Sequence, residues 1–165
     1  KLKKSHREQL VGQIEHEYLY PIGAEPWIFN EFQRYVNSWI QGFKRFSNKP
    51  NFNPKYQLTQ LWINRMKAKE YNPIHIHPLC HLSFILWLEV PQRILQEAKN
   101  KKTNAANPGE VVFIYGEDKW SMVTEKIFTP KVNTLMMFPA ELRHSVMHFN
   151  SKVIRTSVAG NIKFI

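Results

Sequence analysis

The sequence is poor in cysteine and in long apolar segments, and both shortages narrow the possibilities. A single cysteine, Cys80, in 165 residues excludes an internal disulfide and is compatible with a reducing compartment. No apolar run reaches the roughly 20 residues that a transmembrane helix needs, and the longest, residues 82–90, has the length of a buried strand. The basic opening of the chain is followed by no apolar segment. We therefore expect a cytoplasmic protein without a membrane partner.

Acidic residues are also scarce, because 13 of them face 23 lysines and arginines, for a formal net charge of +10. Basic proteins often meet nucleic acid or acidic partners. However, no nucleic-acid-binding motif is present, and the aromatic residues recur at helical and strand spacing, which is typical of a core. A nucleic-acid partner is thus possible but not favoured. We expect a peptide, protein or small-molecule substrate with acidic character.

The hydrophobic pattern predicts helices first and strands afterwards. Apolar residues at three- and four-residue steps predict an amphipathic helix over residues 26–46, and a shorter helix is expected over residues 8–18. Short runs rich in β-branched and aromatic residues predict the strands that follow. This pattern indicates an α+β, mainly β protein, a sandwich or barrel with helices on one face. The expected strands are 58–66, 82–90, 110–115, 122–128, 134–138, 145–149 and 153–162.

These elements fit a single domain over residues 1–165, with residues 1–56 as helical support and residues 57–165 as the β core. Residues 92–107 fit either one or two helical turns or an exposed, lysine-bearing loop.

The placement of the seven histidines is the most informative feature of the sequence. His75 and His77 are two residues apart, and prolines on both sides of the pair disfavour a helix. On an extended chain both imidazoles point to the same face, so they can bind one metal ion. A third ligand from a distant strand would complete a three-residue facial set, for which His144 and His148 are the candidates. His6 and His16 are expected at the surface.

An arginine in an otherwise apolar predicted strand requires a partner, because an unpaired buried guanidinium is costly. Arg155 is such a residue, and the Ser157 hydroxyl faces the same side of the strand. A dicarboxylate ligand would fit this pair through bidentate hydrogen bonds. The alternative is an internal ion pair with a carboxylate such as Glu141.

The order of these motifs resembles the iron(II)/2-oxoglutarate-dependent dioxygenases, and in particular the short, prolyl-hydroxylase-like branch of bacteria and phages. The resemblance covers about residues 57–162. Its motifs, in order, are Leu61-Trp-Ile-Asn64, His75-Ile-His-Pro78, Leu82-Ser83, Trp87-Leu-Glu-Val-Pro91, Phe138-Pro139 with His144, and Arg155-x-Ser157.

The resemblance implies a double-stranded β-helix, or jelly roll, supported by N-terminal helices. It implies iron bound by His75, His77 and His144, and 2-oxoglutarate bound by Arg155 with help from Ser157. Asn64 is assigned to the cosubstrate as well, the alternative being that it only pairs within the sheet. The implied reaction converts 2-oxoglutarate and dioxygen to succinate and carbon dioxide while it hydroxylates a C–H bond, first of all in a peptide or protein proline.

Two other classes of protein share parts of this pattern. A cupin-like metalloprotein also uses a His-x-His pair and a later histidine, and a jelly roll can serve as a binding module without enzymatic activity. Binding of 2-oxoglutarate would raise thermal stability only in an oxygenase. The family topology further predicts that the loop within residues 92–107 lies near the mouth of the jelly roll and covers the substrate.

Overall fold

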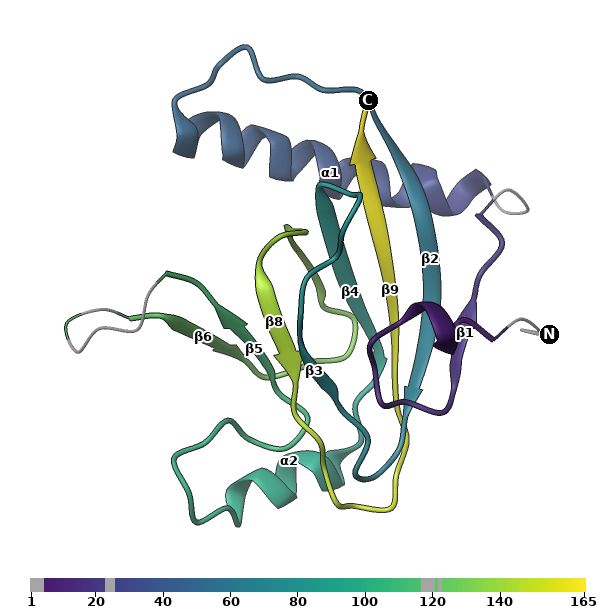
Figure 1. Cartoon of the computed structure of the whole chain (residues 1–165), viewed down its shortest axis with the longest axis vertical. Helices are drawn as coiled ribbons and strands as arrows, with labels where there is room; N and C mark the ends of the chain where they lie inside the picture. The colour runs from purple at the N-terminus through teal and green to yellow at the C-terminus, as the bar shows by residue number, and fades with distance from the viewer. Residues whose placement is uncertain (1–4, 23–25, 117–120, 122) are drawn as a thin grey trace.

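The computed structural model describes residues 5–22, 26–116, 121 and 123–165, which form two antiparallel β-sheets and a long helix (Figure 1). The larger sheet has the strand order β1-β2-β9-β4-β7 and the smaller one β3-β8-β5-β6. The elements are η1 (Arg7–Gln9), β1 (Glu17–Leu19), α1 (Pro26–Ser47), β2 (Tyr56–Met66), β3 (Asn72–His75), β4 (Leu82–Glu89), α2 (Gln92–Lys99), β5 (Val111–Ile114), β6 (Glu125–Phe128), β7 (Leu135–Pro139), β8 (Arg143–Val146) and β9 (Arg155–Phe164).

Helix α1 covers the outer face of the larger sheet (Figure 1). Its buried residues Phe32, Val36 and Ile40 recur every four residues, so they form one stripe along the helix. This stripe packs on strand residues that include Leu61 and Phe84, and the rings of Phe32 and Phe84 stack with centroids 4.4 Å apart. The helix expected over residues 26–46 is thus confirmed.

A second apolar core fills the space between the two sheets. It combines residues of the larger sheet, such as Trp87, with residues of the smaller sheet, such as Phe113, all almost fully buried. Its other buried members are Ile14, Met66, Ile94, Val111, Phe138, Val146 and Phe149. Two antiparallel sheets around one core and a supporting helix confirm the expected mainly β fold of the double-stranded β-helix type.

The N-terminal segment differs from the sequence-based prediction. Instead of a helix over residues 8–18, the chain forms the short 3-10 turn η1 and then the three-residue strand β1. Backbone hydrogen bonds tie the segment to the sheet edge, since Gln13 N–H donates to Tyr71 O and Arg65 N–H donates to His16 O, both at 2.9 Å. Pairing with β2 therefore overrides the local helical pattern.

Most expected strands are confirmed with shifts of a few residues at their ends. The start of the strand expected over residues 122–128 falls partly outside the described residues, and its described part is β6. The short strand β3, which carries His75, was not among the expected strands, because Pro73 lies inside it. The first half of residues 92–107 forms helix α2, whose Ile94 enters the core between the sheets.

None of the helices in the described part of the chain is both long enough and apolar enough to cross a membrane.

Candidate metal centre and active site

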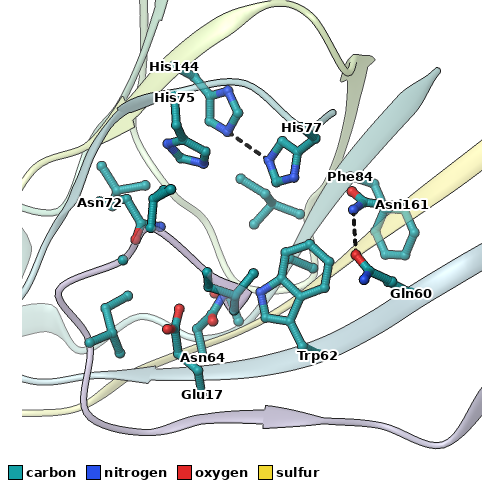
Figure 2. A pocket seen from close by; sticks show the side chains of 18 of the residues that line it. Glu17, Gln60, Trp62, Asn64, Asn72, His75, His77, Phe84, His144 and Asn161 are labelled. Carbon is teal, nitrogen blue, oxygen red and sulfur yellow. Dashed lines mark hydrogen bonds between the residues drawn. The ribbon is translucent and has the colours of Figure 1, made fainter. Parts of the chain in front are cut away.

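Three histidines from two separate parts of the sequence meet at the inner face of the smaller sheet. His75 ends β3 and lies directly opposite His144 on β8, and His77 follows two residues later (Figure 2). Their possible ligand nitrogens all lie within 4.8 Å of one another. The ring centroids are 4.2 Å apart for His75 and His144, and 5.1 Å apart for His77 and either neighbour. These distances suit three imidazoles around one metal ion.

Backbone carbonyls fix the tautomers of two of the three rings. His75 donates from Nδ1 to Pro73 O at 2.7 Å, and His144 donates from Nδ1 to Leu142 O at 2.9 Å. A carbonyl oxygen can only accept, so Nδ1 carries the proton and the lone pair is on Nε2. Such a backbone hydrogen bond is the usual support of a metal-bound histidine. The residues present therefore fit a metal ion.

Burial keeps the histidines neutral at physiological pH. Loss of hydration, together with the neighbouring imidazoles, lowers the pKa of His77 to about 3 and that of His144 to about 4. The pKa of His75 is lowered for the same first reason. His77 Nε2 and His144 Nε2 lie 3.3 Å apart, within hydrogen-bond distance; because His144 Nε2 carries a lone pair, His77 Nε2 can donate its proton to it, and a metal ion would take the place of that proton. The cluster is thus prepared for a cation.

Aromatic side chains surround the histidine cluster. Phe138 meets the His144 ring edge-to-face at 4.8 Å, Phe113 stacks on it at 5.7 Å, and Trp62 lies 5.9 Å from the His77 ring. All three aromatic residues are buried. They restrict the access of water and fix the orientation of the imidazoles.

The buried Arg155 begins strand β9 on the other side of the same cavity. Its guanidinium donates from Nη1 to Gly109 O at 2.7 Å, while Nε is buried without a hydrogen-bond partner. Gly109 has a positive φ of 75°, and the resulting turn aims its carbonyl at the guanidinium. Burial lowers the pKa of Arg155 to about 10, so the group is still charged at neutral pH.

No carboxylate neutralises Arg155 within the described part of the chain. The ion pairs found there involve other residues, and the alternative partner Glu141 is exposed. Ser157 is buried two residues further along β9, and Trp87, its cross-strand neighbour on β4, has a buried indole N–H without a partner. At this end of the cavity, buried N–H donors and one positive charge therefore lack an acceptor, and an anionic ligand would supply it.

A cavity of about 300 Å³ joins the histidines to Arg155. All six residues proposed from the sequence line it: the three histidines, Arg155, Ser157 and Asn64. Asn64 is 7% exposed on β2, opposite Ser157, and its Oδ1 has no hydrogen-bond partner. The cavity therefore brings the metal candidates and the cosubstrate candidates into one space.

The remaining histidines lie outside the cluster. His148 is exposed, and His81 accepts a hydrogen bond from the Phe164 backbone N–H and stacks on its ring. The structure thus brings His144, rather than His148, to the His-x-His pair. The surface expectation for His6 was wrong, because this side chain is 4% exposed and its ring lies 6.0 Å from that of Trp62.

Sequence reasoning missed the wall of the cavity that the N-terminal segment provides. Residues between Gln9 and Ile14, together with Glu17, line the cavity, whereas none of residues 92–107, all of them described, does so. The lysine-bearing loop therefore does not line the cavity, and its role in covering the substrate stays a prediction. No local pattern signalled the N-terminal wall, because Glu17 directly follows the polar residues Glu15 and His16.

Solved structures of low sequence identity share the fold. The viral collagen prolyl hydroxylase of Paramecium bursaria Chlorella virus-1 is 12% identical, with a TM-score of 0.57, and the match covers 96% of this chain and 84% of that chain. A Trichoplax adhaerens prolyl hydroxylase, solved with a peptide fragment of hypoxia inducible factor, is 13% identical, with a TM-score of 0.53 and coverage of 99% and 69%.

An oxidoreductase of the 2OG-Fe(II) oxygenase family from Burkholderia pseudomallei is 19% identical, with a TM-score of 0.50. The match covers 72% of this chain but only 49% of that one, so this chain spans about half the length of that protein. None of the curated proteins matches the sequence.

The comparison with protein families decides between the oxygenase and the cupin alternatives. Residues 60–161, well over half of the chain, match the family model described as 2OG-Fe(II) oxygenase. This segment contains the three clustered histidines and Arg155. Fe(II) and 2-oxoglutarate are the cofactor and the cosubstrate that this membership implies. The chain belongs to the 2OG-Fe(II) oxygenase family of enzymes.

Proposed function

We propose that this chain is an Fe(II)- and 2-oxoglutarate-dependent hydroxylase whose iron ligands are His75, His77 and His144. The observation that carries the proposal is the pairing, across one cavity, of neutral clustered imidazoles with the buried, unneutralised Arg155. A cation fits the first group and an anion fits the second. In this family the bound iron supplies the activation of dioxygen, coupled to oxidative decarboxylation of 2-oxoglutarate.

The protein's own contribution at the metal is orientation. The carbonyls of Pro73 and Leu142 hold the rings of His75 and His144 with Nε2 toward the shared point. Three neutral imidazoles leave the full positive charge of the metal for anionic ligands, and they leave coordination positions for cosubstrate and dioxygen.

Arg155 is proposed to bind the distal carboxylate of 2-oxoglutarate. Gly109 O already orients the guanidinium through Nη1, so its remaining N–H groups can be directed to the ligand. The Ser157 hydroxyl and the Asn64 amide, which face each other across β2 and β9, are proposed to donate to the same cosubstrate. Burial strengthens each of these hydrogen bonds, because little water competes.

For the substrate we propose a peptide or protein, with prolyl hydroxylation as the first candidate reaction. The supporting observation is that two of the solved structures with the same fold are prolyl hydroxylases, one of them with a bound peptide fragment. The net charge of +10 favours a substrate whose overall charge is negative.

The test is an assay of succinate formation with Fe(II) and 2-oxoglutarate, run against pooled proline-containing peptides, small metabolites and single-stranded nucleic acid. Iron-dependent succinate together with a substrate mass increase of one oxygen atom would support the proposal. A protein that neither binds 2-oxoglutarate nor forms succinate under any of these conditions would contradict it.

A further inference from the structure

The N-terminal segment closes one side of the cavity and presents a buried carboxyl group to it. Glu17, on β1, is 2% exposed and lines the cavity, and its Oε2 has no hydrogen-bond partner. None of the ion pairs within the described part of the chain involves it. Figure 2 shows Glu17 beside Asn64, on the side of the cavity that faces the histidines.

Two amide oxygens accompany this carboxyl group. The Oδ1 atoms of Asn64 and Asn72 are both buried without a hydrogen-bond partner, and both residues line the same cavity. Gly12 lies against Asn72 and Glu17 so closely that a Cβ at this position would collide with Asn72 Oδ1 and would stand 2.9 Å from Glu17 Oε1. The missing side chain of Gly12 thus allows the two acceptors to approach each other.

The cavity is therefore chemically divided. One end holds unpaired donors, the Arg155 guanidinium and the Trp87 indole, and it fits the anionic cosubstrate. The other end holds the unpaired oxygens of Glu17 and Asn72. Asn64, which pairs with Glu17 on one side and with Ser157 on the other, lies between the two ends, and its Oδ1 is also unpaired. Buried oxygen acceptors without donors are costly, and a buried carboxyl group is the most costly of them. Loss of hydration and the nearby Glu70 raise the pKa of Glu17 to about 7, so a bound cation would favour its charged form.

From this division we infer that the end formed by Glu17 and Asn72, together with the adjoining Asn64, binds a protonated amine or a guanidinium carried by the substrate close to the carbon that is oxidised. Such a group supplies several N–H donors and one positive charge, which matches three unpaired acceptor oxygens, one of them on a carboxyl group. Trp62, whose indole lines the cavity between Glu17 and Gln60 (Figure 2), adds an aromatic surface that attracts cations.

The inference rests on the proposed function and narrows its substrate class. The net charge of +10 attracts the whole substrate as it approaches within about a Debye length, whereas Glu17 contacts only the group of the substrate that enters the cavity. In a peptide, the cation can come from a basic residue next to the proline. It can also be the free amino group of an N-terminal proline.

Two pairs of peptides distinguish these sources in calorimetric titrations of the anaerobic protein supplied with Fe(II) and 2-oxoglutarate. The first pair is acetyl-glycyl-prolyl-lysine amide and its counterpart with neutral norleucine. The second pair is prolyl-glycine amide with a free amino group and its N-acetylated form. The cationic member of at least one pair should bind roughly tenfold more tightly.

The Glu17→Gln variant should reduce this preference to about twofold, because the amide keeps the shape of the side chain but not the charge. Glu15→Gln is the matched control. Glu15 lies two residues before Glu17, and its side chain is exposed and paired with Lys67, so this variant removes the same charge outside the cavity. It should keep the preference of the wild-type protein.

Equal affinities for both members of each pair in the wild-type protein would overturn the inference. A preference for the cation that survives in Glu17→Gln would overturn it as well. Titration of 2-oxoglutarate in the same samples separates the two proposals. Bound cosubstrate without a cation preference refutes only the inference, whereas absence of cosubstrate binding refutes the proposed function.

Discussion

The two walls of the cavity differ in how their polar groups are held. We group His75 on β3 and His144 on β8 with Arg155, which lies across the cavity on β9, as the first wall, because each makes a hydrogen bond to a backbone carbonyl and points an unused nitrogen at the cavity. On the wall that includes the N-terminal segment, Glu17 and Asn72 each bury an oxygen atom without a partner. The first wall is organised before any ligand binds, whereas the second gains its hydrogen bonds from a ligand.

The two walls also differ in charge at neutral pH. Arg155 remains protonated because its pKa, lowered by burial, is still about 10. Burial raises the pKa of Glu17 to about 7, so this carboxyl group can gain or lose its proton near neutral pH. The anionic cosubstrate thus meets a permanent charge, while the opposite wall can adapt its charge to the group that it binds. Three of the four predictions below alter one wall at a time, and the fourth concerns residues outside both walls.

The largest effect is expected at the metal. His144→Ala should weaken Fe(II) binding roughly 100-fold or more, because it removes one of three proposed ligands. Elemental analysis and titration with Fe(II) measure this loss. His148→Ala, which removes an exposed histidine four residues further on, should bind iron normally. Equal iron content in both variants would place the metal elsewhere.

The next effect concerns the donor end of the cavity. Arg155→Ala should weaken 2-oxoglutarate binding by roughly 100-fold, since loss of one partner of a buried charge pair costs about 2–5 kcal/mol. Arg155→Lys should restore only part of the affinity, because lysine lacks the planar fork. Calorimetry at equal folded fraction measures both variants, and exposed Arg143→Ala on β8 is the control. Unchanged affinity in Arg155→Ala would move the carboxylate site away from β9.

The third effect is a pH dependence of stability, which the raised pKa of Glu17 predicts. The pKa of Glu17 is raised by burial from 4.5 to about 7, so between these values the folded protein holds a proton that the unfolded chain has lost. The free energy of unfolding should therefore fall as pH rises through this range, by roughly 3 kcal/mol in all. Glu70 enhances this shift and Arg7 opposes it.

Glu17→Gln should remove that dependence, so it should be more stable than the wild type at pH 8 and about equal to it near pH 4. Urea denaturation at several pH values measures the difference. Glu15→Gln should follow the wild-type curve between pH 5 and pH 8, because the pKa of Glu15 is lowered by its hydrogen bond to Lys67 rather than raised. Parallel curves for Glu17→Gln and the wild type would contradict a buried, protonated Glu17.

The two walls also differ in how well the sequence predicted them. The His-x-His pair and the alternation of Arg155 and Ser157 are local patterns, so they predicted these parts of the first wall, whereas the pattern alone left both His144 and His148 open as the third ligand. Helix α1 was predicted because its apolar period persists over some six turns. Glu17, however, belongs to a three-residue strand, and strands of this length carry no readable period. Its burial depends on pairing with Asn64, 47 positions away, which no local pattern encodes.

The smallest effect is expected outside both walls, at Lys99, which ends α2, and at Lys101 and Lys102, which follow it. The sequence suggested that Lys99, Lys101 and Lys102 cover the substrate, but none of them lines the cavity. Helix α2 is instead held against the loop before β9, where Glu97 accepts hydrogen bonds from Asn150 and Ser151.

Replacing the three lysines with alanine should therefore lower kcat/KM for an acidic peptide only about two- to threefold, through weaker long-range attraction. The difference should vanish at about 0.5 M salt, where the Debye length falls to a few ångströms. A salt-independent loss of turnover with intact 2-oxoglutarate decarboxylation would instead mean that this loop contacts the bound substrate.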